Sequence, residues 1–92
     1  MLNGHVILNN QEQEGNYRFT GIRQYMTAAF KSTFGNEAES IIFTAIALIL
    51  EKYPHNADYL QTFDYIKSDG TSIRFWIIND IDYLTALLPS DY

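Results

Sequence analysis

The sequence has 92 residues, the length of one domain with a single hydrophobic core. It carries six basic and eleven acidic side chains, a net charge of −5, and its aromatic content of 15% is typical of a folded chain and excludes a disordered one. The absence of cysteine excludes a disulfide framework and a thiolate metal site. Met1–Leu8 shows no basic stretch ahead of a long apolar run, so we expect no secretion signal and a cytoplasmic protein.

The first third of the chain predicts two short strands and a helix. Gly4–Leu8 is a β-prone run, Asn9–Gly15 is a polar loop with nothing apolar to bury, and Asn16–Thr20 is a candidate second strand. In Ile22–Phe34 the apolar residues recur at steps of three and four, which is the period of an amphipathic helix. Gly35 then predicts the end of this helix in the left-handed conformation.

The longest apolar stretch predicts a central helix over Asn36–Tyr53. Asn36 and Glu39 have the spacing of a capping box, and Pro54 ends the helical region. The body, Ile41–Leu50, holds a single polar residue and no charge, so the helix must be covered on several sides. A membrane span is the rival interpretation, but crossing the hydrocarbon takes about 20 apolar residues and this run is much shorter. We therefore expect no membrane insertion and a helical hairpin made by the two predicted helices.

The last third predicts a β-hairpin formed by Asp58–Lys67 and Ser72–Asn79. Asp69-Gly70 is a strong signal for a two-residue type I′ turn, which fixes a cross-strand register. In that register one sheet face carries Tyr59, Phe63, Tyr65, Arg74, Trp76 and Ile78. The other face is more aliphatic and is expected to pack on the central helix, with Leu60, Ile66, Ile73, Phe75 and Ile77.

The predicted fold is a single α+β domain over residues 1–92. It consists of a helical hairpin with one long buried helix, packed on a small antiparallel sheet. The sheet is a three-stranded C-terminal meander whose third strand, Tyr83–Leu87, stops before Pro89, with the N-terminal run as a further strand.

Catalytic and metal-binding motifs are absent from the sequence, including the nucleophile elbow, the Walker loop, the dinucleotide fingerprint and zinc signatures. His5 and His55 have no paired acid at ligand spacing. Asp80 and Asp82 lack the further oxygen ligands and the closing Glu of an EF-hand loop, so turn formation explains them better. An acid/base pair would form only if the fold brought two aspartates together in a pocket. We expect no enzyme activity, no metal and no cofactor.

Charge is distributed unevenly along the chain. Residues 16–35 contain Arg18, Arg23 and Lys31 and no acid, whereas residues 36–92 contain nine acids and three bases. Three cations on a net-acidic domain make a weak phosphate-binding footprint, so direct nucleic-acid binding is not expected. The acidic part would steer the protein toward a basic surface, such as a groove built for nucleic acid, although plain solubility explains the same charge.

Two segments of the last third carry a resemblance to known sequences. Asp58–Phe63, and Phe75–Ile78 leading to Thr85–Tyr92, are similar to segments of short uncharacterised proteins of Gram-positive bacteria, their phages and mobile elements. Small acidic proteins of such elements are often anti-defence factors, including anti-CRISPR proteins that occupy the nucleic-acid groove of a Cas nuclease. The resemblance implies a partner of that class, and it identifies no site residue.

The sequence thus predicts a non-enzymatic, protein-binding domain, in its sharpest form an inhibitor of a Cas nuclease or another nucleic-acid-binding defence protein. Five carboxylates would stand in for phosphates: Asp58, Asp64, Asp80, Asp82 and Asp91. Tyr65, Arg74 and Trp76 would anchor the contact, because aromatic and arginine side chains dominate binding hot spots. The alternative is a homodimeric accessory protein that uses the aromatic sheet face as its interface.

Overall fold

The long apolar run forms the central helix, as predicted. The structure, a computed structural model that describes residues 2–92, has helix α2 over Ala38–Lys52, and Tyr53 ends it ahead of Pro54. The predicted start is wrong, because Asn36 lies inside a 3-10 turn, Gly35–Glu37, and not at a helix cap. The chain is already helical when it reaches Asn36, so this residue has no free first turn to cap.

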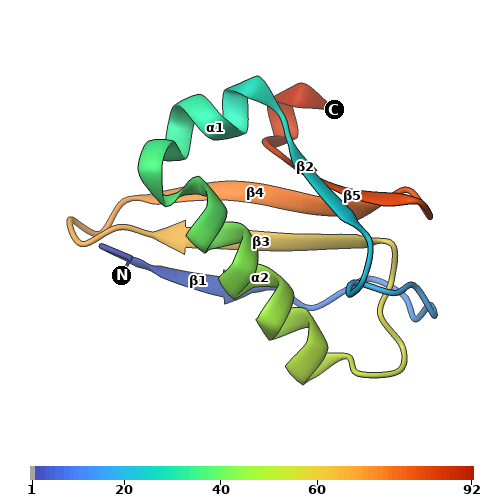
Figure 1. The fold of residues 1–92 in the computed structure, drawn as a ribbon. Helices are drawn as coiled ribbons and strands as arrows, with labels where there is room; N and C mark the ends of the chain where they lie inside the picture. The colour runs from blue at the N-terminus through green and yellow to red at the C-terminus, as the bar shows by residue number, and fades with distance from the viewer. Residues whose placement is uncertain (1) are drawn as a thin grey trace.

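Helix α1 is shorter than predicted because a strand takes up the first part of its segment. Arg23–Met26 forms β2, whose backbone pairs in parallel with the C-terminal strand, and α1 covers only Ala28–Phe34. Thr27 begins α1, since its hydroxyl accepts a hydrogen bond from Phe30 N at 3.1 Å. Gly35 ends α1 with a φ of 54°, as predicted. The two helices then meet at a corner in place of the expected hairpin (Figure 1).

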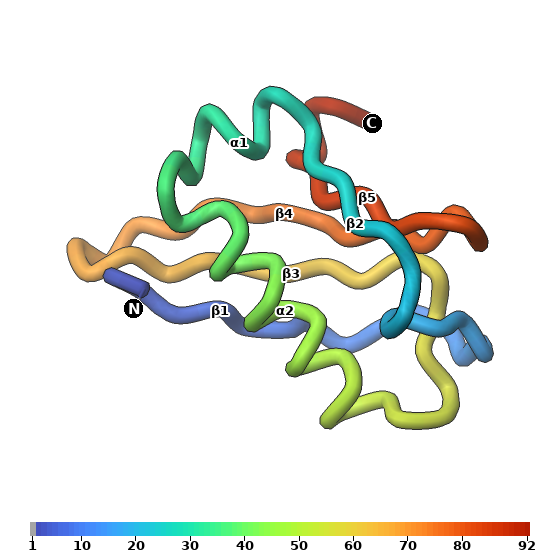
Figure 2. The backbone as a smooth tube through the Cα atoms, in the orientation of Figure 1, coloured from blue at the N-terminus to red at the C-terminus, as the bar shows by residue number. Residues whose placement is uncertain are grey.

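Residues 2–92 contain five strands, which form one mixed sheet in the order β1-β3-β4-β5-β2. The predicted meander is present, with β3 over Leu60–Ile66, β4 over Ser72–Asn79 and β5 over Tyr83–Leu87. β1, over His5–Leu8, pairs antiparallel with β3 and confirms the N-terminal strand. The expected strand at Asn16–Thr20 is wrong, since among the described residues this stretch makes a single backbone–backbone hydrogen bond, from Tyr17 N to Ala57 O in the loop before β3. Both helices lie on one face of the sheet (Figures 1 and 2), so the α+β class is confirmed.

The β3–β4 hairpin is where predicted, but its register is shifted by one residue. Lys67 N donates to Thr71 O at 2.8 Å, so three residues, Ser68 to Gly70, form the loop in place of two. Gly70 takes a φ of 89°, and the Asp69 carboxylate accepts hydrogen bonds from Thr71 N and Oγ1 at 2.9 and 2.6 Å. A one-residue slip turns one strand's side chains to the other face. The predicted mates of β3 and β4 are therefore wrong, and the true pairs are Asp64 with Arg74, Phe63 with Phe75 and Tyr65 with Ile73.

The core lies between the helices and the sheet face that they cover, which we call the inner face. Phe63 and Phe75 stack at its centre with ring centroids 4.8 Å apart and an interplanar angle of 7°. Phe30 and Phe34 of α1 meet the Phe75 ring edge-on, at 5.5 and 5.7 Å. Helix α2 adds fully buried side chains from one of its sides, namely Ile41, Ala45 and Ile49. Such aromatic pairs contribute about 0.5–1.5 kcal/mol each beyond their buried area.

Helix α2 is not covered on all sides, in contrast to the prediction. Phe43 is 77% exposed, and Leu50 is also exposed on the side that faces away from the sheet. The segment Ala28–Lys52, taken as one helical stretch, is long and apolar enough to cross a membrane by length and composition alone. In this fold its inner side packs on the sheet as a core helix does.

Candidate functional site

The opposite sheet face, which we call the outer face, has no α-helix over it within residues 2–92, and a C-terminal 3-10 turn, Pro89–Asp91, brings Tyr92 against its Trp76. Because side chains alternate along each strand, the observed register places on it a mixed set of aromatic, aliphatic and polar residues. Ile7, Tyr25 and Tyr83 are exposed there by 43%, 48% and 40%. The rings of Tyr25 and Tyr83 form an edge-to-face pair at 5.5 Å, as do those of Trp76 and Tyr92 at the same distance. The outer face therefore carries exposed aromatic rings, whereas Ile78 and Leu87, which the register also places on it, are buried.

Three predicted site residues, Asp64, Arg74 and Trp76, come together on the outer face. Arg74 donates from Nε to Asp64 Oδ1 and from a terminal nitrogen to Oδ2, both at 3.1 Å. This bidentate hydrogen bonding lowers the pKa of Asp64, against the opposing effect of burial, and Asn9 Nδ2 adds a third donor at 3.2 Å. Asp64 and Arg74 thus neutralise each other beside Trp76.

Tyr65, also predicted as an anchor, lies elsewhere, and that part of the prediction is wrong. The register shift turns it to the inner face, where only 2% of its surface is exposed. Its hydroxyl donates a hydrogen bond to Glu37 Oε1 at 3.2 Å. Burial, with a smaller contribution from the Glu37 charge, raises the pKa of Tyr65. Its role is structural, between the sheet and the start of α2.

The remaining predicted carboxylates do not form a common acidic surface. Asp80 and Asp82 are exposed in the tight β4–β5 turn, where Ile81 has a φ of 76°. Asp91 accepts hydrogen bonds from the Thr27 hydroxyl and from Leu88 N, at 2.7 and 3.0 Å, so it holds the C-terminal turn against α1. Asp58 is only 5% exposed. Of the five predicted phosphate mimics, Asp80 and Asp82 alone are free carboxylates at the surface of the described chain.

A cavity of about 550 Å³ opens on the outer face beside Trp76. One wall is the loop 9–13, and the other comes from β3, β4 and the two residues before β3. The cavity is lined by polar and aromatic side chains together, including Glu12, Asp58, Tyr59, Arg74 and Trp76. It joins three predicted site residues, Asp58, Arg74 and Trp76, with a loop that the sequence did not connect to them.

Gln11 fixes this loop in place. Its Oε1 accepts hydrogen bonds from Asp58 N at 2.8 Å and from Gln61 Nε2 at 2.9 Å, and its Nε2 donates to Asn56 O at 2.9 Å. Its backbone N–H donates to the Tyr53 hydroxyl at 3.0 Å. A polar loop that appeared unattached in the sequence is thus bonded to the end of α2 and to the start of β3. Only the concentration of amide side chains at residues 9–13 hinted at this role.

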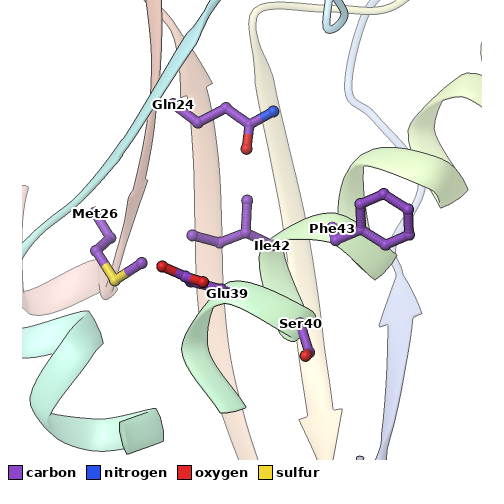
Figure 3. A pocket seen from close by; sticks show the side chains of 6 residues that line it. All are labelled: Gln24, Met26, Glu39, Ser40, Ile42 and Phe43. Atoms are coloured by element: carbon purple, nitrogen blue, oxygen red, sulfur yellow. The ribbon is translucent and has the colours of Figure 1, made fainter. Parts of the chain in front are cut away.

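A second hollow, of about 490 Å³, lies on the helix side, between β2 and α2. Figure 3 shows Gln24, Met26, Glu39 and Ile42 turned toward one another, with Ser40 and Phe43 pointing away from them. Glu39 is the one carboxylate in its lining, so the described residues give this hollow no acid/base pair. Across residues 2–92, no group of three or more His, Asp or Glu side chains is placed to hold a metal ion.

Comparison with known proteins gives no relative from which a function could be transferred. The chain matches no protein-family model, no curated protein sequence and no solved structure.

Proposed function

We propose that the protein acts by binding another protein through the outer face of its sheet, without catalysing a reaction. The observation that carries the proposal is an uncovered sheet face on which Ile7, Tyr25 and Tyr83 are each at least 40% exposed. Tyr25 and Tyr83 form an exposed aromatic pair on β2 and β5, and Ile7 adds an exposed apolar side chain on β1 at the other edge of the sheet. Exposed apolar side chains gathered on one face of a small domain favour burial by a partner. Trp76 and Arg74 belong to the residue types that dominate binding hot spots.

Charge on the outer face also suits a protein partner. The domain carries a net charge of −5, but the outer face contains the mutually neutralised pair Asp64–Arg74 and the cation Arg23. Burying an isolated charge under a partner would be costly, but Asp64 and Arg74 are already paired with each other, so this cost is avoided for them. The exposed acids around the rest of the surface would increase the rate of encounter with a basic protein.

The partner class stays a prediction. A nucleic-acid-binding defence protein such as a Cas nuclease is compatible with an acidic domain that uses an aromatic face. The phosphate-mimic version has less support, since Asp64 is paired with Arg74 and Asp91 is bonded to Thr27 and Leu88. We therefore assign the contact to the outer face and not to an array of carboxylates.

A second copy of the chain is the alternative occupant of the outer face. The near-neutral centre of this face would let two copies meet there without bringing their unpaired acids together. In that case the purified protein alone has the mass of a dimer, and a Trp76→Ala variant has the mass of a monomer.

The test compares capture of a partner from a cell lysate by three immobilised proteins. They are the wild type, the double variant Tyr25→Thr/Tyr83→Thr, and Phe43→Gln, which removes a still more exposed apolar side chain from α2. Threonine keeps a strand-forming residue on the sheet, so the fold is retained. We expect the wild type and Phe43→Gln to capture the same protein and the double variant to bind it at least about 30-fold more weakly, the effect of losing a hot spot. Equal capture by all three would refute the assignment to the outer face.

A further inference from the structure

The cavity beside Trp76 contains a carboxylate without a cation. Asp58 is only 5% exposed, and its Oδ1 accepts a hydrogen bond from Tyr59 N at 2.8 Å. Its Oδ2 accepts no hydrogen bond from residues 2–92, and the ion pair found there is Arg74–Asp64, which does not include it. Among residues 2–92, Gln61 Oε1 is the one buried side-chain atom without a hydrogen-bond partner, so Asp58 Oδ2, which also has none, is reached by solvent. Asp58 therefore offers an accessible acceptor that a cationic ligand would engage.

The other charged groups of the cavity leave this acceptor free. Arg74 lines the same cavity, but its Nε and one terminal nitrogen are bonded to Asp64, and it forms no hydrogen bond with Asp58. Glu12, on the loop wall, is exposed and adds a second negative charge. The charged side chains of the lining, Asp58, Glu12 and Arg74, are net negative and favour a cation over phosphate or carboxylate.

The aromatic residues of the cavity favour the same kind of ligand. Trp76 and Tyr59 both line it, and Leu60 adds apolar surface between them. An ammonium or guanidinium group is attracted to the face of an aromatic ring, most strongly to that of tryptophan. The aliphatic stem of such a side chain also buries well against apolar walls. A lining that combines a carboxylate with aromatic rings suits both the charged end and the aliphatic stem of a basic side chain.

We infer that this cavity receives a lysine or arginine side chain from the partner protein. The inference rests on the proposed function, because the cavity opens on the outer face that we assign to the partner. The partner should therefore present a basic side chain that projects from the surface with which it contacts Tyr25, Tyr83 and Trp76. This contact gives the net-acidic domain a specific anchor in addition to general electrostatic attraction.

Trp76 is the single tryptophan of the protein and therefore reports on the cavity directly. The experiment titrates the whole protein with blocked tetralysine and tetra-arginine peptides, and with blocked tetraglutamate and tetraserine, while Trp76 fluorescence is recorded. The variants are Asp58→Asn, which keeps an acceptor for Tyr59 N, and Asp82→Asn, which removes the same charge from the distant β4–β5 turn. Glu12→Gln is a third variant, and it should fold like the wild type because the Glu12 side chain is exposed.

We expect saturable binding of the basic peptides only. Asp58→Asn, which removes the charge inside the cavity, should weaken that binding at least about 10-fold, and Asp82→Asn, which removes an exposed and distant charge, less than about 2-fold. If Asp58→Asn does not fold, weaker binding by Glu12→Gln than by Asp82→Asn supports the same cavity. Equal weakening by all three variants, or no saturable change in the wild type, overturns the inference. If the peptides fail in this way but Tyr25→Thr/Tyr83→Thr still fails to capture the partner, the inference of a lysine or arginine in the cavity is wrong and the outer face remains the binding surface. If the capture test also fails, the proposed function has failed with it.

Discussion

Replacing Gln11 by alanine should destabilise the protein more than a loop position normally would. The side chain of Gln11 accepts hydrogen bonds from Asp58 N and Gln61 Nε2 and donates one to Asn56 O, at 2.8 to 2.9 Å. Asp58 and Gln61 are both buried, so water cannot replace Gln11 at either donor without local opening. Gln61 Oε1 already lacks a hydrogen-bond partner within residues 2–92, so this corner tolerates no further loss.

The magnitude follows from the three lost bonds. A typical protein hydrogen bond contributes about 0.5–1.5 kcal/mol net, and a buried donor left without an acceptor costs about 1–3 kcal/mol. Gln61 Nε2 keeps a second acceptor, Asp58 O at 3.0 Å, so the main penalty falls on Asp58 N. We expect Gln11→Ala to lower the free energy of unfolding by about 2–4 kcal/mol. This is a large share of the roughly 5–15 kcal/mol typical of a domain.

The assay is urea unfolding followed by Trp76 fluorescence, with the melting temperature as a second readout. Gln13→Ala is the matched control, because Gln13 is the same residue type in the same loop, is exposed, and makes no side-chain hydrogen bond within the described chain. Gln11→Ala should lower the Tm by more than about 8 °C, and Gln13→Ala by very little. Similar small losses for both variants would show that Gln11 does not hold the cavity wall, and the reasoning would be refuted.

Two further substitutions test the inner face and the β1 edge. Tyr65→Phe should cost about 0.5–1.5 kcal/mol near neutral pH, through loss of the bond to Glu37. Because burial raises the pKa of Tyr65 above its ordinary 10.0, the wild type should lose stability as pH rises above 10. The difference in free energy of unfolding between the wild type and Tyr65→Phe, measured by denaturation, should therefore shrink above pH 10. A difference that stays constant with pH would contradict this. Gly4→Ala should cost about 1–3 kcal/mol in unfolding experiments, since an added Cβ would lie 2.1 Å from Ile66 O in the neighbouring strand. A Gly4→Ala variant as stable as the wild type would show that the neighbouring strand accommodates the Cβ and would contradict this prediction.

Local sequence signals located most of the elements but not their partners. The uncharged run 41–50, the Pro54 stop and the alternation of β5 were sufficient to place α2 and the meander, because those signals act within one segment. The helical period of residues 22–34 was misleading, since residues 23–26 pair with β5, a strand about 60 positions later. Tertiary pairing of this kind has no local trace in the sequence.

The sequence predicted part of the candidate site correctly. The errors come from the length of the β3–β4 loop, which is one residue longer than predicted. Counting two loop residues at Asp69-Gly70 put Tyr65 opposite Arg74, whereas the actual three-residue loop puts Asp64 opposite Arg74. Trp76 and Arg74 were correctly expected on one face because they belong to the same strand, whose alternation does not depend on the turn. Gln11 could not be identified, because its hydrogen-bond partners are 42 to 50 residues away in the sequence.

The most direct test of the outer face as a binding surface is hydroxyl-radical footprinting of the wild-type protein, free and in complex with the partner that it captures. It needs no substitution, and the exposed rings of Tyr25, Tyr83 and Phe43 are reactive probes on opposite sides of the molecule. Our account predicts that complex formation protects Tyr25 and Tyr83 from oxidation and leaves Phe43 unchanged. Protection of Phe43 with no change at the two tyrosines would place the partner on α2 and contradict the account.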